Sequence, residues 1–394
     1  MNSRRSCLLS WCESNGVDLD GRLDISDEKI LSNDFILKDS VVARIPKDSL
    51  LTLKTSTIST QLSQIPLTHV VALSFALVFE IQSANQSKWH LYIQSLPLTP
   101  PDIASLWPFT PEMAGTELCK RYSMLNSHQG IRGRQTKQKL KDTFDAHAST
   151  LNITSTFEAF LYAYAITSSR LFQVDTHHQV GLVPVADLFN HLEEPTVAIE
   201  SDLVVCDCCG WLNGCIQSPN TDYLTTPPQT LDIVTTHTTQ PAEELFNSYG
   251  DSLDNVDLAI EYGFVLEAND SDRVTFDAIP PIYTVQTLQD DDQDLFVAHP
   301  DAFIDSQARV SLGLFGVCDT DVLNLIVLAY QQSETITDGY LRQLIQQLLQ
   351  RIDERLGEYP PQVDTKAANP LLMQMRNDEL GLLQTAKMRF DGLL

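Results

Sequence analysis

The chain has 394 residues, 26 of them basic and 52 acidic, and its formal net charge is −26. This charge disfavours direct nucleic-acid binding and favours a basic protein partner. The longest apolar run, Val70–Phe79, is too short to span a bilayer, and the N-terminus lacks the apolar core of a secretory signal peptide. We therefore expect a globular protein of about two domains by length. We also expect it to be a monomer in the cytoplasm, the nucleus or both, without a membrane partner.

Residues 1–54 are predicted to begin with a helix and to continue as short strands. The segment Ser6–Asn15 has helical character, and Gly16 after it is a typical helix stop. Phe35–Leu37 and Val41–Ile45 are rich in strand-forming residues and flank a turn-like break.

Residues 55–165 are predicted to be mostly helical. Thr68–Ile81 is strongly apolar, Trp89–Leu96 is amphipathic, and Phe157–Thr167 places aromatic residues on one helix face. Such aromatic faces are typical of a protein core, and we interpret them so. The basic run Ser127–Lys141 is predicted to form a solvated helix face.

Four cysteines lie close together in the segment 202–229, at Cys206, Cys208, Cys209 and Cys215. The spacing Cys206-x-x-Cys209-Gly is half of a zinc knuckle, but no second pair of cysteines follows. The irregular spacing also differs from the disulfide framework of a small secreted protein. We therefore expect reduced thiols in a surface loop and predict no metal site.

The stretch Glu244–Phe264, ELFNSYGDSLDNVDLAIEYGF, is the most informative part of the chain. Glu244–Asn247 has the character of a strand end, and Ser248–Gly250 that of a tight turn. Asp254–Tyr262 carries apolar residues at helical spacing before Gly263 ends the pattern. Two tyrosines and a phenylalanine on such a strand-turn-helix segment are suited to lining a narrow pocket.

Residues 266–394 contain an acidic stretch at 290–294 and then helical patterns. Leucine and isoleucine recur on one face between 341 and 356, and Gly357 with the prolines after it is predicted to stop this helix. Leu371–Met388 is predicted to form another helix. This part is expected to be a separate, all-α domain.

Four elements of the chain resemble, in content and order, the motifs of SET-domain protein-lysine methyltransferases of the Rubisco large-subunit methyltransferase type. They are SKWHLYIQSLP at 87–97, SRLF at 169–172, PVADLFNH at 184–191, and the SYG and YGF motifs within 244–264. A lone SYG would be weak evidence, whereas four ordered elements are specific. The resemblance spans about residues 20–265.

The resemblance implies an α+β fold. Its parts are a β-rich SET fold of small curled sheets with a knot-like C-terminal part, a helical insertion, and a C-terminal all-α domain. The implied domains are the N-terminal helix with the first part of the SET domain at 1–54, the helical insertion at 55–165, the C-terminal part with the active site at 166–265, and a substrate-binding-like domain at 266–394.

The resemblance further implies methyl transfer from S-adenosyl-L-methionine to the side-chain amine of a lysine in a protein. The acidic charge favours a basic substrate, such as a ribosomal protein or a histone. Tyr249 is the implied catalytic residue, with its hydroxyl orienting the amine. The implied cofactor-binding residues are Arg170, Asn190, His191 and Phe264, and the implied substrate-binding residues are Ser169, Asp187, Tyr249 and Tyr262.

Two positions depart from the family pattern. The segment Ser26–Asp34 has no glycine where the family has a glycine-rich turn near the cofactor, and Val174 stands where some members have a basic residue. The missing glycine turn leaves open a non-catalytic SET-type module that binds peptides. A second alternative is methylation of histidine, which the same fold supports.

Overall fold

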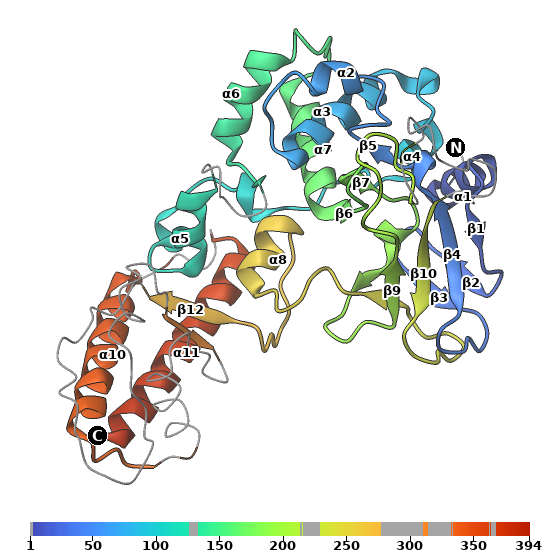
Figure 1. The fold of residues 1–394 in the computed structure, drawn as a ribbon. Helices are drawn as coiled ribbons and strands as arrows, with labels where there is room; N and C mark the ends of the chain where they lie inside the picture. The colour runs from blue at the N-terminus through green and yellow to red at the C-terminus, as the bar shows by residue number, and fades with distance from the viewer. Residues whose placement is uncertain are drawn as a thin grey trace. The chain divides into compact units, whose positions relative to one another are not determined.

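The computed structural model describes residues 3–125, 133–212, 215, 229–276, 310–313, 332, 334–361, 363 and 368–394. The acidic stretch at 290–294 lies outside these residues. The chain divides into two compact units (Figure 1). The first comprises Met1–Trp107, Met124–Ser252 and Ile260–Gly263, and the second Pro108–Ser123, Leu253–Ala259 and Phe264–Leu394. Two short segments inside the predicted domains 55–165 and 166–265 are therefore counted in the second unit.

The largest sheet of the first unit has four antiparallel strands in the order β1-β4-β10-β9. Their bounds are β1 Asp18–Leu19, β4 Val41–Pro46, β10 Thr230–Thr235 and β9 Val197–Glu200. In β4 the side chains of Ala43 and Ile45 are buried. Arg44 between them is exposed and pairs across the strands with Asp232 of β10, at 3.1 Å. The sheet thus joins strands that are far apart in the sequence, with one face against the core.

Three smaller sheets complete the β structure of the first unit. They are the β2-β3 hairpin (Leu23–Ile25, Ile30–Ser32), the antiparallel β5-β7-β6 sheet (Leu51–Thr52, Val180–Leu182, Leu171–Gln173) and the parallel pair β8-β11 (Asn190–His191, Phe246–Asn247). The small sheets predicted from the sequence are confirmed. The strand predicted at 35–37 is wrong, because only Ile36 forms an isolated bridge, with Thr239.

The helix predicted near the N-terminus is confirmed as α1 (Arg4–Ser14), and the helices predicted between residues 55 and 165 are also present. They are α2 Ser59–Leu62, α3 His69–Gln82, α4 His90–Ser95, α5 Glu117–Met124, α6 Lys137–His147 and α7 Phe157–Arg170. Helix α3 is apolar on all sides and almost fully buried, as such a composition requires. It packs on α7, with the rings of Phe75 and Phe160 4.5 Å apart.

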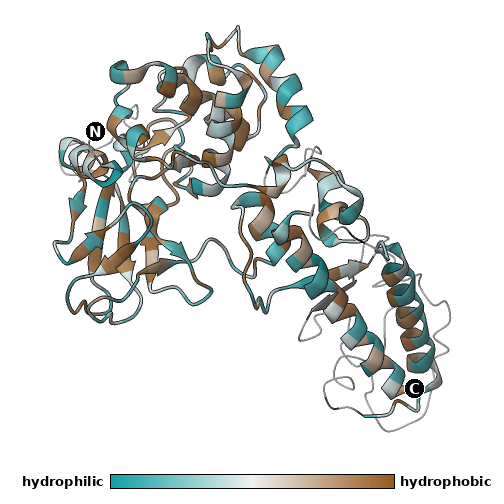
Figure 2. Ribbon diagram, turned by 180° about the vertical axis from the view of Figure 1, so that it is seen from behind, coloured by the Kyte–Doolittle hydropathy of each residue, from teal (hydrophilic) through white to brown (hydrophobic). Residues whose placement is uncertain are grey.

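The second unit has a helical core around α10 (Gly339–Glu358) and α11 (Pro370–Leu393). Hydrophobic residues recur along α10 with hydrophilic residues between them (Figure 2), and Ile345 and Ile352 of this helix are fully buried. Helix α10 continues through Gly357 to Glu358, so the predicted stop is one residue early. An antiparallel pair of strands, β12 (Arg273–Phe276) and β13 (Val310–Gly313), accompanies the helices. The expected helices are present, but this part is not purely α-helical.

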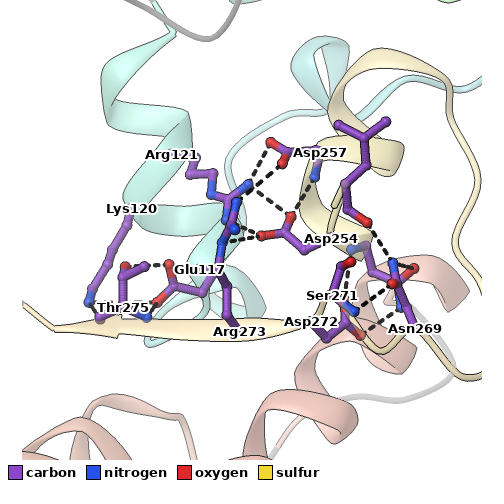
Figure 3. Close-up of polar contacts among 12 residues, drawn as sticks. Glu117, Lys120, Arg121, Asp254, Asp257, Asn269, Ser271, Asp272, Arg273 and Thr275 are labelled. Atoms are coloured by element: carbon purple, nitrogen blue, oxygen red, sulfur yellow. Dashed lines mark hydrogen bonds and ion pairs between the residues drawn. The ribbon is translucent and has the colours of Figure 1, made fainter. Parts of the chain in front are cut away.

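An ion-pair network connects α5, the start of α8 (Asn255–Glu261) and β12 within the second unit (Figure 3). The guanidinium of Arg121 pairs with Asp254 and Asp257, and Arg273 approaches the same two carboxylates at 3.2 and 3.8 Å. Because Arg121 and Asp254 are buried, each charge requires its partners. The network therefore fixes the point at which α8 begins.

Candidate active site

A cavity of about 330 Å³ in the first unit is lined in part by residues of three elements, namely SRLF at 169–172, PVADLFNH at 184–191, and the SYG and YGF motifs within 244–264. It is lined by Ser169, Leu171, Phe172, Gln173, Asp187, Pro195, Val197, Ala198, Ile199, Asn247, Ser248, Tyr249 and Tyr262. The four residues that the sequence analysis assigned to substrate binding are all among them. Most of the remaining lining is apolar, as in typical small-ligand and side-chain pockets.

The parallel pair β8-β11 places the Asn-His motif beside the tyrosine turn. Phe246 lies opposite Asn190, and Asn247 lies opposite His191. Directly after this pair, the backbone N–H of Tyr249 donates a hydrogen bond to Nδ1 of His191, at 3.2 Å. Two motifs that are nearly 60 residues apart in the sequence thus form one rigid corner of the cavity.

Tyr249 and Tyr262 form an aromatic wall. Their ring centroids are 4.6 Å apart, and the Tyr262 hydroxyl donates to the carbonyl of Tyr249, at 3.2 Å. The Tyr249 hydroxyl donates to the carbonyl of Phe189, also at 3.2 Å. Burial raises the pKa of Tyr249 to about 12. This phenol is therefore protonated at neutral pH and acts as a hydrogen-bond donor rather than as a base.

Asp187 is held at the cavity by two partners. Tyr92 of α4 donates its hydroxyl to Asp187 Oδ2 at 3.0 Å, and Nε of Arg170 lies 3.5 Å from the same oxygen. Nη1 of Arg170 donates to the hydroxyl of Ser169, at 3.2 Å. Burial raises the pKa of Asp187, and this effect exceeds the opposing effects of Arg170 and Tyr92. The sequence analysis did not assign Tyr92, although it lies in the SKWHLYIQSLP element.

Three of the residues assigned to cofactor binding, Arg170, Asn190 and His191, belong to the first unit and are not part of the cavity lining. Nδ2 of Asn190 donates to Oε1 of Glu244 at 2.7 Å and to the carbonyl of Glu28 at 3.4 Å. Glu28 belongs to the turn of the β2-β3 hairpin, so the segment without glycine lies against the Asn-His motif. Burial lowers the pKa of His191, which keeps its imidazole neutral. Phe264 is counted in the second unit, and its role stays a prediction.

A buried ion pair fixes the position of Glu261, the residue directly before Tyr262. Arg134 pairs with Glu261 at 3.1 Å, with 3% and 1% of the two side chains exposed. Nη2 of Arg134 also donates to the carbonyl of Ser168, and the Ser168 hydroxyl donates to the carbonyl of Glu261, at 2.9 and 3.0 Å. These contacts tie the residue before Tyr262 to the end of α7. Arg134 lies in the basic run that was predicted to be solvated, so for this residue the prediction was wrong.

Gly263, directly after Tyr262, has a φ of +81°. A Cβ atom at this position would come within 3.0 Å of the backbone of Asp102. Only glycine combines this left-handed conformation with so close an approach. The glycine of the YGF motif therefore determines how the chain leaves the aromatic wall.

Solved structures with a similar fold include the SET domain of LSMT and Rubisco LSMT. The match to the SET domain of LSMT bound to lysine and AdoHcy covers 98% of this chain and 90% of the LSMT chain, with a TM-score of 0.64 and 15% sequence identity. Rubisco LSMT bound to AdoMet matches with a TM-score of 0.62 at 15% identity, over 99% of this chain and 92% of its own. The chain has the SET-domain fold of the Rubisco LSMT type. This confirms the fold expected from the four motifs.

Curated relatives of this SET-fold chain are also methyltransferases. Ribosomal lysine N-methyltransferase 3 of Saccharomyces cerevisiae is 22% identical over 345 residues, which cover 66% of this chain and 61% of the yeast protein. N-lysine methyltransferase setd6 of Xenopus tropicalis is 24% identical over 286 residues, covering 66% of this chain and 56% of the frog protein. The chain thus spans about three fifths of the length of these relatives. No family model matches it, and none of its described helices meets the length and hydropathy of a membrane span.

Proposed function

We propose that this chain transfers a methyl group from S-adenosyl-L-methionine to the side-chain amine of a lysine in a protein. The observation that carries the proposal is the cavity in which Tyr249 and Tyr262 stand beside the paired Asn-His and tyrosine-turn strands. The relatives named above are lysine methyltransferases, and the structures of the same fold were solved with lysine, AdoHcy or AdoMet. Both findings support this activity for the chain.

The residues around the cavity fit the proposed cofactor. S-adenosyl-L-methionine supplies an electrophilic methyl group when it is bound. Asn190 offers an exposed amide beside the β2-β3 turn, and His191 offers a neutral ring. Arg170 has five N–H donors, so its guanidinium can serve a carboxylate while it contacts Asp187 and Ser169. We propose these three residues as the cofactor site, with Phe264 as a further member.

The aromatic wall would prepare the lysine for transfer. An amine must arrive neutral, and deprotonating a free lysine at pH 7 costs about 4 to 5 kcal/mol, because its pKa is about 10.4. A dehydrated, aromatic-walled slot lowers that pKa by burial. The protonated Tyr249 hydroxyl and the polar groups of Ser169 and Asp187 would orient the amine. Their role is to position the amine and to complement charge, and none of them needs to remove a proton.

A basic protein is the proposed substrate class. The chain carries a net charge of −26, which attracts basic partners at low ionic strength. The yeast relative is a ribosomal lysine N-methyltransferase, and ribosomal proteins are therefore the first candidates, with histone tails as the second. We also propose that the chain acts as a monomer in the cytoplasm or the nucleus.

The test uses the full chain, labelled S-adenosyl-L-methionine, and ribosomal proteins or histones as separate substrates. The Tyr249→Phe variant is expected to transfer methyl groups about a hundredfold more slowly, because it loses the hydroxyl that positions the amine. Tyr162→Phe is the matched control, since the Tyr162 hydroxyl bonds to the carbonyl of Pro97 and does not line the cavity. Labelled amino acids are then identified by mass spectrometry.

Three outcomes would contradict the proposal. Label on histidine alone would assign the chain to histidine methylation. Binding of substrate peptide without detectable binding of S-adenosyl-L-methionine in calorimetry would assign it to a non-catalytic module. Equal rates for Tyr249→Phe and Tyr162→Phe would remove Tyr249 from the catalytic role.

A further inference from the structure

The four cysteines of the connection between β9 and β10 lie together in space. The Sγ atoms of Cys206, Cys208, Cys209 and Cys215 are all within 4.8 Å of one another. Those of Cys206 and Cys208 are 3.2 Å apart, and those of Cys208 and Cys215 are 3.0 Å apart. A disulfide has a sulfur–sulfur distance of about 2.0 Å, and none of the described cysteines forms one. The group is therefore a cluster of four thiols, called here the cysteine cluster.

The spacing within the cysteine cluster suits tetrahedral coordination. Zinc binds thiolate sulfur at about 2.3 Å, so the four sulfurs of a tetrahedral site lie about 3.8 Å from one another. The sulfur–sulfur distances in the cluster, from 3.0 to at most 4.8 Å, bracket this value. Four sulfur ligands in a tetrahedron select zinc or iron over oxygen-preferring ions such as magnesium and calcium.

The backbone of the cluster forms a knuckle-like turn. The carbonyl of Cys206 accepts hydrogen bonds from the N–H groups of Cys209 and Gly210, at 3.3 and 2.7 Å. Gly210 has a φ of +74°, and a Cβ atom at this position would be 3.2 Å from the ring of His177. The N–H of Cys206 donates to the carbonyl of Trp211, at 2.9 Å. This tight turn presents Cys206 and Cys209 on the same side, as a zinc knuckle requires.

The segment leading into the cluster is anchored to the core of the first unit. Buried Lys47 pairs with Asp175 and donates to the carbonyl of Asp202, both at 2.8 Å. Thr176 exchanges hydrogen bonds with the backbone of Val205, at 2.6 and 3.0 Å. The carbonyl of Asp207 accepts a hydrogen bond from Nδ1 of His177, at 2.7 Å. Because these contacts already order the segment, little chain entropy remains to be lost when a ligand binds there.

A divalent cation suits such a group of sulfurs, because it binds thiolates and displaces their protons.

We propose that Cys206, Cys208, Cys209 and Cys215 bind one zinc ion as a structural site. With four protein ligands the site is closed, so its role is to fix the connection between β9 and β10 and not to activate a substrate. The prediction of no metal, made because no second cysteine pair follows Cys209, is replaced by this proposal. The site does not depend on methyl transfer, so the two proposals stand or fall separately.

The experiment measures metal in the purified full chain by plasma mass spectrometry, without chelators during purification. We expect one equivalent of zinc in the wild type and in the control Cys119→Ser, whose cysteine lies in the second unit. Cys208→Ser and Cys215→Ser are each expected to lower zinc affinity by about tenfold or more. Circular dichroism verifies that the variants fold.

A cobalt titration of the wild type tests the site without any substitution. Cobalt alone, added after chelator treatment, is expected to give the sulfur-to-metal charge-transfer and visible bands of a tetrahedral thiolate site, and added zinc is expected to remove them. Absence of zinc together with absence of these bands would overturn the proposal. So would iron in place of zinc, equal zinc content in Cys208→Ser and the wild type, or a mass showing that the four cysteines form disulfides.

Discussion

The position of Tyr249 in the fold determines the chemical role that its hydroxyl can have. Its hydroxyl donates to the carbonyl of Phe189, the residue before Asn190, and burial raises its pKa to about 12. In the SYG motif alone the same residue could be a nucleophile, a base or a core aromatic. The neighbouring carbonyl accepts the hydrogen bond of the hydroxyl, and the raised pKa keeps the phenol protonated, which agrees with a reaction that depends on positioning.

The hydrogen bond from the Tyr92 hydroxyl to Asp187 is predicted to stabilise the folded protein. Replacing Tyr92 by phenylalanine removes the hydroxyl that donates to buried Asp187 Oδ2. We expect a loss of about 1 to 3 kcal/mol in the free energy of unfolding, because a buried acceptor loses its donor. Urea denaturation measures the change. In an Asp187→Asn background the same substitution should cost less, and an equal cost in both backgrounds would show that Tyr92 acts by packing alone.

At the scale of elements, the two ends of helix α8 are held by different ion pairs. Its start is fixed by Arg121 with Asp254 and Asp257 (Figure 3). Its last residue, Glu261, is fixed by Arg134. The sequence pattern predicted the helix itself, and Gly263 marked its end. The two arginines were not predicted, because each is more than 120 residues from its partners in the sequence.

Breaking the Arg134–Glu261 pair is predicted to destabilise the first unit and slow methyl transfer. Glu261→Gln leaves the guanidinium buried without its countercharge, which costs about 3 kcal/mol or more. The control is Asp145→Asn on α6, where an exposed i,i+4 pair with Lys141 is worth under about 0.5 kcal/mol. Thermal unfolding and the rate of methyl transfer are measured on both variants. Similar losses in the two would contradict a positioning role for the buried pair.

At the scale of the whole molecule, the net charge concerns the choice of substrate, whereas a buried carboxyl group concerns stability. The net charge of −26 favours a basic substrate. The interior of the second unit instead holds a carboxyl that burial keeps protonated. Glu379 on α11 accepts hydrogen bonds from the N–H of Glu117 and, at 2.6 Å, from the hydroxyl of Tyr359. Burial raises its pKa from 4.5 to about 8.

Glu379 is predicted to make stability fall as pH rises. Its folded pKa lies above its unfolded value, so the folded state binds the proton more tightly, and its contribution decreases between about pH 4.5 and pH 8. Glu379→Gln, which is neutral at every pH, should weaken this dependence in thermal unfolding. Glu354→Gln, at an exposed pair with Arg351, is the control and should retain it. The same pH profile in wild type and Glu379→Gln would contradict the prediction.

Several parts of the fold and site could be predicted from the sequence because their signals are local. The apolar runs identified α3, α7, α10 and α11, and the SYG turn and Gly263 depend on adjacent residues. The four motifs also selected the residues that line the cavity, namely Ser169, Asp187, Tyr249 and Tyr262. Their roles stay predictions, but their proximity is a property of the structure.

Only the tertiary structure decided which distant residues meet. Tyr92 reaches Asp187 across 95 positions, and β8 pairs with β11 in parallel. The sequence by itself determined the helices, the turns and the SET-type motifs, because backbone preference and periodicity act within a few residues. The buried ion pairs and the pKa shifts depend on burial and long-range packing, which no local pattern encodes.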